Sequence, residues 1–533
     1  MKDSSYFFHS SSSRLVIVCL VSLVLVSAAV IAMDSRRSYW VFLDDSSSSS
    51  SSFSNESSSS SNSSSSWKWG GGDVGHGNHK KVPLELHPRL ESFGQEALSD
   101  SQPLYNRSSS SLLANNTNFL VKQADEKQLN DTSTTKIRRV HSQVMRIEAS
   151  LARARALIRE AAKNETGLPS APPDPDYAPY GPVYRNANAF HRSYLEMEKV
   201  FKIFVYKEGE PPLFHDGPCR SIYSSEGRFI YDLETNTQFR TSDPDIAHVH
   251  FLPFSITKMV HYLYEPNSFN LKPVKQTVVD YINVISNKYP YWNRSLGADH
   301  FLLSCHDWGP EVSYAAPHLY NNSIRVLCNA NSSEGFNPSK DATLPEINLR
   351  TGSIKGLIGG PSPSKRPYLG FFAGGVHGPI RPLLLKHWKG VDQDLRIYEY
   401  LPKELSYYDM MRKSKFCICP SGYEVASPRI VEAMYSECVP VIISDHYVLP
   451  FSDVLNWKSF SVQIQVGDIP RLKSILMSIS QRQYIRMHRR VKQVQRHFVV
   501  NSTPKRYDVF HMIIHSVWLR RLNRIPHYND QNN

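Results

Sequence analysis

The stretch that decides the fold is Ser414–Trp457, SKFCICPSGYEVASPRIVEAMYSECVPVIISDHYVLPFSDVLNW. Phe416–Cys419 is a short apolar run that ends in the turn sequence Pro420–Gly422, which predicts a buried strand. Ser427 and Pro428 predict a helix start, with Ser427 as N-cap and the proline as first helical residue. Cys438–Ser444 is a second β-branched run, so we expect a strand, a loop, a helix and a parallel strand.

This unit predicts a site for a nucleotide diphosphate. A helix N-terminus at the carboxyl end of a parallel strand binds phosphates through free backbone N–H groups. Arg429 lies in the first helical turn and could add a bidentate phosphate contact. Glu432, one turn later, is placed to accept hydrogen bonds from ribose hydroxyls. We therefore expect Ser427, Arg429 and Glu432 to form this nucleotide-diphosphate site.

A second phosphate-facing loop follows the apolar run Arg366–Ala373, which predicts another strand. Gly374, Gly375 and Gly378 would allow a close approach of the backbone, and Arg381 lies in the helix expected to begin at Pro379. The alternative is a sharp strand-to-helix turn with no ligand. The pairing of this loop with the Ser427–Glu432 site in one domain favours the phosphate interpretation.

The segment SPRIVEAMYSECVPVIISDHYVLPF resembles the signature of exostosin-type glycosyltransferases, especially their plant cell-wall branch. The similarity runs from about Val200 to about Phe498. The resemblance implies a two-domain GT-B fold, a UDP-sugar donor, inversion at the anomeric carbon and no required metal. Animal exostosins carry an arginine-rich loop where this chain has Gly422–Glu424. Glu424 and Glu432 also share the Glu-x7-Glu spacing of retaining GT-B enzymes, a spacing that is common by accident, and Glu424 is included among the candidate donor ligands.

Inverting sugar transfer needs a base for the acceptor hydroxyl and cations for the leaving diphosphate. Arg381, Ser427 and Arg429 are the candidates for the leaving-group side. His306 and Asp307 are the candidate bases, because they follow the apolar run His300–Cys305 at a strand end, and they resemble a motif of the family. The structural alternative is that Asp307 caps a turn against which His306 packs.

Two further patterns have bland alternatives. His215-Asp216 is a second candidate base, but the following glycine also fits an Asp-Gly turn. His248-x-His250 would place both side chains on one strand face, where a buried core face is favoured over a metal site. We interpret three Asp-x-Asp triplets as turns or caps, so we expect neither a metal nor a cofactor. These triplets are Asp174-x-Asp176, Asp243-x-Asp245 and Asp392-x-Asp394.

Residues 15–33 form an uncharged apolar run between Arg14 and Asp34, long enough for a bilayer core of ~30 Å. A cleavable signal peptide is the alternative, with Val30-x-Ala32 as cleavage site. We expect a Golgi type II membrane protein, with residues 1–14 cytosolic and the remainder luminal. Asn-x-Ser/Thr sequons support a luminal location. They are Asn55, Asn62, Asn106, Asn115, Asn130, Asn164, Asn293, Asn321, Asn331 and Asn501.

Residues 34–175 read as a luminal stem, since Ser46–Ser66 is almost pure serine and cannot bury enough apolar surface to fold. Within it, residues 136–163 repeat apolar side chains with 3,4 spacing. This pattern fits a short coiled coil, which would form a homo- or hetero-oligomer, and equally a single amphipathic helix packed on the catalytic part. The repeating residues are Ile137, Val140, Val144, Ile147, Leu151, Ala154 and Ile158.

The remaining chain predicts an α/β fold with two Rossmann-like domains. Residues 176–355 form the N-terminal, acceptor-side domain and 356–500 the nucleotide-sugar domain, while 501–533 contain a helix that crosses back. Seven cysteines include Cys19 in the apolar run, so the other six allow up to three disulfides. Cys305 with Cys328 is the first pair expected. Cys417-x-Cys419 is too tight for a zinc half-site and fits alternation along one strand.

The formal charge of +12 excludes little by itself. A luminal protein does not meet nucleic acid, so the expected electrostatic partners are the donor diphosphate and an acidic polysaccharide acceptor. Solvated Lys and Arg side chains explain much of the excess. The leading prediction is a Golgi glycosyltransferase for cell-wall hemicellulose or pectin, with xylose, arabinose, galactose or glucuronic acid donors all allowed. A non-catalytic scaffold subunit and a carbohydrate-binding membrane receptor are the alternatives.

Overall fold

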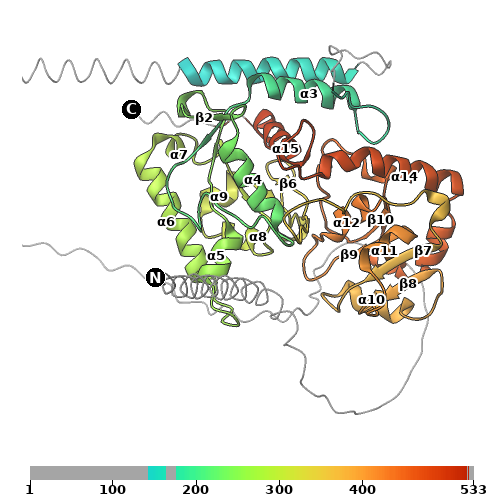
Figure 1. Ribbon diagram of the computed structural model, residues 1–533. Coiled ribbons are helices and arrows are strands. Elements are labelled where there is room, and N and C mark those ends of the chain that lie inside the picture. The colour runs from blue at the N-terminus through green and yellow to red at the C-terminus, as the bar shows by residue number, and fades with distance from the viewer. Residues whose placement is uncertain (1–141, 164–175, 525, 527–533) are drawn as a thin grey trace, which may run out of the picture. The chain divides into compact units, whose positions relative to one another are not determined.

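The computed structural model describes residues 142–163, 176–524 and 526 of the 533-residue chain (Figure 1). These residues fall within one compact unit, Ser109–Asn533. The predicted cytosolic tail, membrane span and serine-rich stem lie outside the described residues, as do the sequons up to Asn164. Within the described part of the chain, no helix is both long and apolar enough to cross a membrane.

The first domain contains a six-stranded parallel sheet of order β2-β1-β3-β4-β5-β6. The side chains of the longer strands are buried throughout, as is typical of a sheet covered by helices on both faces. Its strands are β1 (Ile203–Val205), β2 (Arg240–Thr241), β3 (Val249–Phe251), β4 (His300–Ser304), β5 (Ile324–Leu327) and β6 (Ala342–Thr343). Its helices are α3 (Ala187–Val200), α4 (Ser224–Thr235), α5 (Ile256–Leu263), α6 (Lys272–Lys288), α7 (Pro290–Ser295), α8 (Gly309–Ser313) and α9 (Pro317–Asn321).

The second domain contains a five-stranded parallel sheet of order β11-β10-β9-β7-β8. Its strands are β7 (Tyr368–Ala373), β8 (Leu395–Tyr398), β9 (Ser414–Pro420), β10 (Val439–Ile443) and β11 (Val462–Ile464). Its helices are α10 (Ile380–Trp388), α11 (Tyr407–Lys413), α12 (Arg429–Tyr435), α13 (Leu472–Met477) and α14 (Gln481–Gln495). Two Rossmann-like α/β domains with parallel sheets are therefore confirmed. The last helix, α15 (Val509–Asn523), packs against β5 and β6, so the chain returns to the first domain (Figure 1).

The predicted start of α12 needs one correction. Pro428 is the N-cap residue and already has right-handed helical dihedral angles, and Ser427 makes no capping hydrogen bond. The helix begins at Arg429 and has only seven residues. Its dipole is correspondingly small, so charged side chains must contribute more of any anion binding than the sequence suggested.

Residues 142–163 form a helix that lies alongside α3 in Figure 1. Leu151 and Ala154 of the heptad seam are buried in the main hydrophobic core. Asn186 donates to the Ala162 carbonyl at 3.0 Å, and Arg155 donates to the Leu522 carbonyl at 2.8 Å. The seam thus packs on this chain's own catalytic part, which supports the amphipathic-helix interpretation over the coiled coil.

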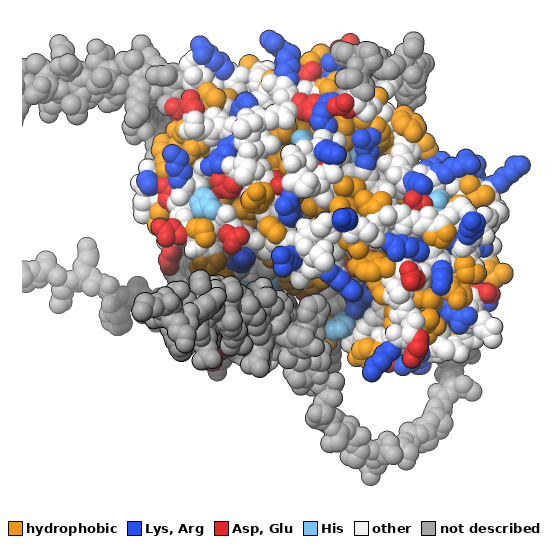
Figure 2. Space-filling view, viewed as in Figure 1, with side chains coloured by type: hydrophobic (Ala, Val, Ile, Leu, Met, Phe, Trp, Pro, Cys, Tyr) orange, Lys and Arg blue, Asp and Glu red, His pale blue; other side chains and the backbone are white. Residues whose placement is uncertain are grey.

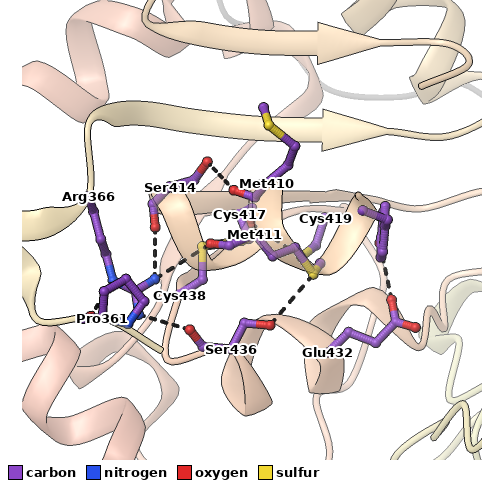
Figure 3. Close-up of a disulfide and its surroundings, with 11 residues drawn as sticks. Pro361, Arg366, Met410, Met411, Ser414, Cys417, Cys419, Glu432, Ser436 and Cys438 are labelled. Carbon is purple, nitrogen blue, oxygen red and sulfur yellow. Dashed lines mark hydrogen bonds between the residues drawn. A yellow bond between two sulfur atoms is a disulfide. The ribbon is translucent and has the colours of Figure 1, made fainter. Parts of the chain in front are cut away.

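The structure contains the expected disulfide Cys305–Cys328 and a second bridge, Cys417–Cys438, which was not predicted (Figure 3). Cys417 lies in β9 and Cys438 directly precedes β10, so the second bridge ties two neighbouring strands together. Among the described residues, Cys219 and Cys419 remain free, so two bridges form rather than three.

The described sequons differ in accessibility. Asn321 is exposed, and Asn293 and Asn501 are half-buried. Asn331 is buried, and its side-chain oxygen accepts a hydrogen bond from the Ser333 backbone N–H. Asn321 is therefore the best placed of the four for a glycan. On the face shown in Figure 2, Lys and Arg side chains are interspersed with Asp and Glu, which fits a solvated surface.

Candidate active site

The second sheet reverses its strand order between β7 and β9, with β8 on one side and β10 and β11 on the other. Ligands of open α/β sheets bind outside the carboxyl ends of the strands at such a switch point. The loop after β7 and the loop after β9 both leave the sheet at this point. These are the two loops that the sequence assigned to phosphate binding.

Glycines let the two loops approach each other closely. A Cβ at Gly378, where φ is +68°, would lie 1.8 Å from the Gly422 carbonyl oxygen. A Cβ at Gly374 would lie 2.7 Å from Nη2 of Arg429. Gly422 in turn borders Nη2 of Arg381, 3.0 Å from its own ideal Cβ position. The loops therefore form one backbone-lined surface with both arginines at its edge, while the phosphate contacts of Gly374, Gly375 and Gly378 stay a prediction.

Arg429 is buried with hydrogen-bonding capacity left over. Its guanidinium lies over the Phe372 ring at 4.8 Å and its Nη2 donates to the Ala373 carbonyl at 3.1 Å. Its Nε and Nη1 are buried and donate to none of the described residues. Burial acts to lower the pKa of Arg429, but nearby Tyr407, Cys419 and Glu432 raise it by more. The pKa is therefore raised overall, and the guanidinium stays charged.

Arg381 adds a second guanidinium beside the first. Its Nε is buried without an acceptor among the described residues, and its Nη1 reaches only the Gly375 carbonyl, at 3.5 Å. Burial and the positive charge of Arg429 lower the pKa of Arg381 to about 10. Two like charges with unused N–H donors are costly to keep together, so this pair has the properties of a site for a doubly charged anion.

Glu432 is held by three protein donors. Its Oε1 accepts from Asn348 at 3.1 Å and from Tyr408 at 3.2 Å, and its Oε2 accepts from Tyr407 at 3.1 Å. A carboxylate has about four acceptor positions, so one remains, on Oε2. The ribose contact assigned to Glu432 stays a prediction, and Glu432 also links the two domains through Asn348. Ser427 is buried at the end of the β9 loop, directly before Pro428 and α12.

Residues of the first domain also contact the loop after β9. Asn329, just after β5, donates to Glu424 and so joins the two domains at a second point. Burial raises the pKa of Glu424 to about 7, although the hydrogen bond from Asn329 opposes the shift. Glu424, predicted as a donor ligand, thus lies between the domains with one carboxylate oxygen already engaged.

The two predicted bases, His306 and Asp307, belong to the first domain and form different hydrogen bonds. Nδ1 of His306 accepts the Trp308 backbone N–H at 3.0 Å, and burial lowers the pKa of His306 to about 4. The neutral ring therefore carries its proton on Nε2 and offers a donor there, not an acceptor. The side chain of Asp307 accepts a hydrogen bond from Tyr223, whose ring lies 5.0 Å from that of His306.

Glu346 was not singled out in the sequence. It follows β6 at the carboxyl end of the first sheet, within the segment Leu344–Asn348. The glutamate is buried, and desolvation together with the charge of Asp307 raises the pKa of Glu346 well above its usual value. The available signal was an acid directly after an apolar β-branched run, ATLPE, but that run is too short to identify a strand with certainty.

The remaining sequence candidates have structural roles. His215 pairs with Glu234 at 2.6 Å and Asp216 with Lys258 at 3.0 Å, so both side chains are engaged in ion pairs within the first domain. Asp243 caps a 3-10 turn, and Asp392 accepts the Asp394 backbone N–H, as expected for turns and caps.

His248 and His250 are both buried in the sheet, as favoured for a core strand. His250, Asp299 and His300 bring their possible ligand atoms within 4.8 Å of one another. Asp299, however, already accepts hydrogen bonds from Ser295 at 2.6 Å and from Arg294 at 3.1 Å. Burial lowers the pKa of His250 to about 3, so the ring is neutral.

Comparison with known proteins places this architecture in a family. Residues 197–479 match the model of the exostosin GT47 domain. A probable glycosyltransferase of Arabidopsis thaliana is 67% identical over 388 residues, which cover 73% of this chain and 74% of the relative. A probable glucuronosyltransferase of Oryza sativa subsp. japonica is 27% identical over 354 residues, 61% of this chain and 81% of the relative. Among solved structures, the Anabaena protein HepE in complex with UDP-glucose aligns with a TM-score of 0.29 and 12% identity, covering 59% of this chain and 97% of that one. The chain belongs to the exostosin GT47 family and is a glycosyltransferase.

Proposed function

We propose that the protein transfers a sugar from a UDP-sugar to a cell-wall polysaccharide, with inversion at the anomeric carbon and without a metal ion. The observation that carries this proposal is the pair Arg381 and Arg429 at the switch point of the second sheet. Both guanidinium groups have buried N–H donors with no acceptor among the described residues. A nucleoside diphosphate would supply the missing acceptors and neutralise both charges.

In the proposed reaction the two domains have different roles. An acceptor hydroxyl held by the first domain attacks the anomeric carbon while the bond from that carbon to the UDP oxygen breaks. Negative charge develops on the departing diphosphate, and two preorganised arginines stabilise it without the reorganisation that water would need. In a metal-dependent enzyme a divalent cation would provide this stabilisation, and here two fixed cations are placed to do so.

In this proposal the second domain, which holds the arginine pair, binds the donor, and the first domain binds the acceptor. Hydrogen bonds from Asn329 to Glu424 and from Asn348 to Glu432 cross between the domains beside the arginine pair. UDP-glucuronic acid is the first donor to test, because several rice relatives are named probable glucuronosyltransferases. Xylose, arabinose and galactose donors follow.

A donor screen on the purified full-length protein tests the proposal. UDP-sugar hydrolysis and thermal stabilisation by UDP are measured with and without EDTA. Turnover of one UDP-sugar that persists in EDTA is the expected result. Turnover that disappears in EDTA and returns with Mn²⁺ would contradict metal independence. Absence of both turnover and UDP stabilisation would contradict the donor site and favour the scaffold alternative.

A Golgi location with the catalytic part in the lumen is part of the same proposal, and residues 15–33 are its proposed anchor. The exposed sequon at Asn321 offers a test of the side of the membrane. A glycan at Asn321, detected by mass spectrometry, is expected. An unmodified Asn321 in protein purified from the native membrane would argue against a luminal catalytic part.

A further inference from the structure

Glu346 lies in the segment Leu344–Asn348, where the two domains meet, and the residues that follow it form hydrogen bonds with each domain. The carbonyl of Ile347 accepts the Ser224 hydroxyl at 2.6 Å, which ties the segment to α4. The side chain of Asn348 donates to Glu432 of the second domain at 3.1 Å. Hydrogen bonds of Ile347 and Asn348 thus anchor the segment that carries Glu346 to both domains.

The carboxylate of Glu346 is buried but unused. Its side chain is 6% exposed, and its pKa is shifted by burial and by neighbouring charges, with no hydrogen bond among the causes. It interacts electrostatically with groups of both domains. Those facing it are Asp307, Tyr223, Glu432, Arg381, Arg429 and Tyr447. A buried carboxylate without a protein partner is costly, and a site that admits a hydroxyl group would relieve that cost.

The two bases predicted from the sequence are already engaged. The hydrogen bond from Trp308 to Nδ1 of His306 leaves an N–H donor at Nε2, which cannot accept a proton from a hydroxyl. Asp307 accepts a hydrogen bond from Tyr223, which stabilises its ionised form and makes it a weaker base. Glu346 interacts electrostatically both with Asp307 and with the arginine pair, so it lies near the two groups that the proposed transfer has to bring together.

We infer that Glu346 is the general base of sugar transfer, an inference that rests on the proposed function. One carboxylate oxygen takes the proton of the acceptor hydroxyl as that oxygen bonds to the anomeric carbon. The bond from the anomeric carbon to the UDP oxygen breaks in the same step, and its electron pair stays on the diphosphate beside Arg381 and Arg429. Charge and atoms balance without a further reactant.

The environment of Glu346 suits this role. Burial and the negative charges of Asp307 and Glu432 raise the pKa of Glu346 well above its usual range, and the two arginines oppose the shift. A carboxylate with an ordinary pKa is a weak base at neutral pH, whereas one shifted upward accepts a proton more readily. The ionised form is needed for catalysis, so activity should rise with pH through this raised pKa.

The test compares Glu346→Gln and Glu346→Asp with Glu160→Gln, a control on the exposed face of helix 142–163. Glu346→Gln keeps shape and removes basicity, so we expect kcat to fall ~10²–10⁴-fold, with KM for the donor and UDP affinity nearly unchanged. The acidic limb of the pH profile should disappear in Glu346→Gln and persist, at reduced rate, in Glu346→Asp.

Each other outcome has a defined meaning. Glu346→Gln with near-normal kcat and an intact acidic limb overturns the inference and leaves the proposed function standing. Loss of UDP binding in Glu346→Gln assigns the residue to holding the cleft and also overturns the inference. A wild-type protein that neither binds UDP nor turns over any donor overturns the proposed function, and the role of Glu346 falls with it.

Discussion

Arg429 and Arg366 form a matched pair that separates ligand binding from structural support. Both are buried arginines of the second domain. Arg366 spends its donors on four backbone carbonyls, those of Pro361, Met411, Ser414 and Ser436, at 2.9–3.5 Å (Figure 3). Arg429 donates to the Ala373 carbonyl and interacts with Tyr407, while its Nε and Nη1 have no acceptor among the described residues. Replacing each by methionine should therefore have opposite consequences.

The size of the effect on UDP affinity follows from the two free N–H groups of Arg429. A hydrogen bond to a charged group contributes about 1.5–3 kcal/mol, so two such bonds to the diphosphate contribute about 3–6 kcal/mol. At about 1.4 kcal/mol per factor of ten, Arg429→Met should raise the Kd for UDP about 10²–10⁴-fold. Arg366→Met should leave the Kd unchanged at temperatures where the variant is folded.

The effects on stability should run the other way. Arg429→Met removes a buried charge with two unused donors at the loss of one hydrogen bond, so the free energy of unfolding should fall by less than about 1 kcal/mol or rise. Arg366→Met leaves buried carbonyl oxygens without a donor and should cost about 3–5 kcal/mol.

Titration calorimetry with UDP and urea unfolding followed by tryptophan fluorescence measure the two quantities on the same preparations. The reasoning is refuted if Arg429→Met binds UDP as tightly as wild type. It is equally refuted if Arg429→Met is destabilised as much as Arg366→Met, since Arg429 would then be a structural arginine.

Three further predictions test the frame around the site. Gly378→Ala should abolish UDP binding, because the new Cβ would lie 1.8 Å from the Gly422 carbonyl oxygen. Gly390 has a similar φ of +72° but open space around it, so Gly390→Ala should lower the free energy of unfolding by only about 1 kcal/mol and bind UDP normally in the same calorimetry. Cys417→Ser should lower the free energy of unfolding by about 3 kcal/mol under non-reducing conditions, because the bridge to Cys438 closes a segment of sequence separation 21, while Cys419→Ala should cost about 1 kcal/mol. The free energy of unfolding should be greatest above pH ~6.5 and should fall on acidification towards pH 3. Burial lowers the pKa of several neutral histidines to about 3, so in this pH range the unfolded chain binds protons that the folded chain does not. A urea midpoint that stays constant over this range would contradict the prediction. These histidines are His248, His250, His497 and His515.

The second domain could be predicted from local patterns. Apolar runs located β7, β9 and β10, and glycines after the first two located the loops. Because carboxyl ends of parallel strands meet at one edge, Arg381 and Arg429 could be placed in one site without any structure. The bridge Cys417–Cys438 was within reach too, since Cys438 directly precedes the strand that pairs with Cys417 through Pro440.

The junction between the domains could not be predicted in this way. Glu346, Asn348 and Asn329 follow short strands of the first sheet and meet the second domain only after both domains have docked. The hydrogen-bond partners of Asn348 and Asn329 lie more than eighty residues away in the chain, and no periodic pattern connects them. The state of His306 also depends on a single backbone hydrogen bond, which residue type and spacing do not reveal.

The electrostatics of the cleft argue for an enzyme over a scaffold. Two adjacent guanidinium groups and a buried carboxylate without partners each raise the free energy of the empty fold. A scaffold subunit would gain nothing from them, and replacing them with apolar residues of similar volume would be neutral or stabilising. The arrangement is advantageous only if an anion regularly neutralises the arginines and a hydroxyl regularly meets the carboxylate. The proposed donor diphosphate and acceptor hydroxyl would meet both requirements, so these buried charges favour an enzyme over a scaffold.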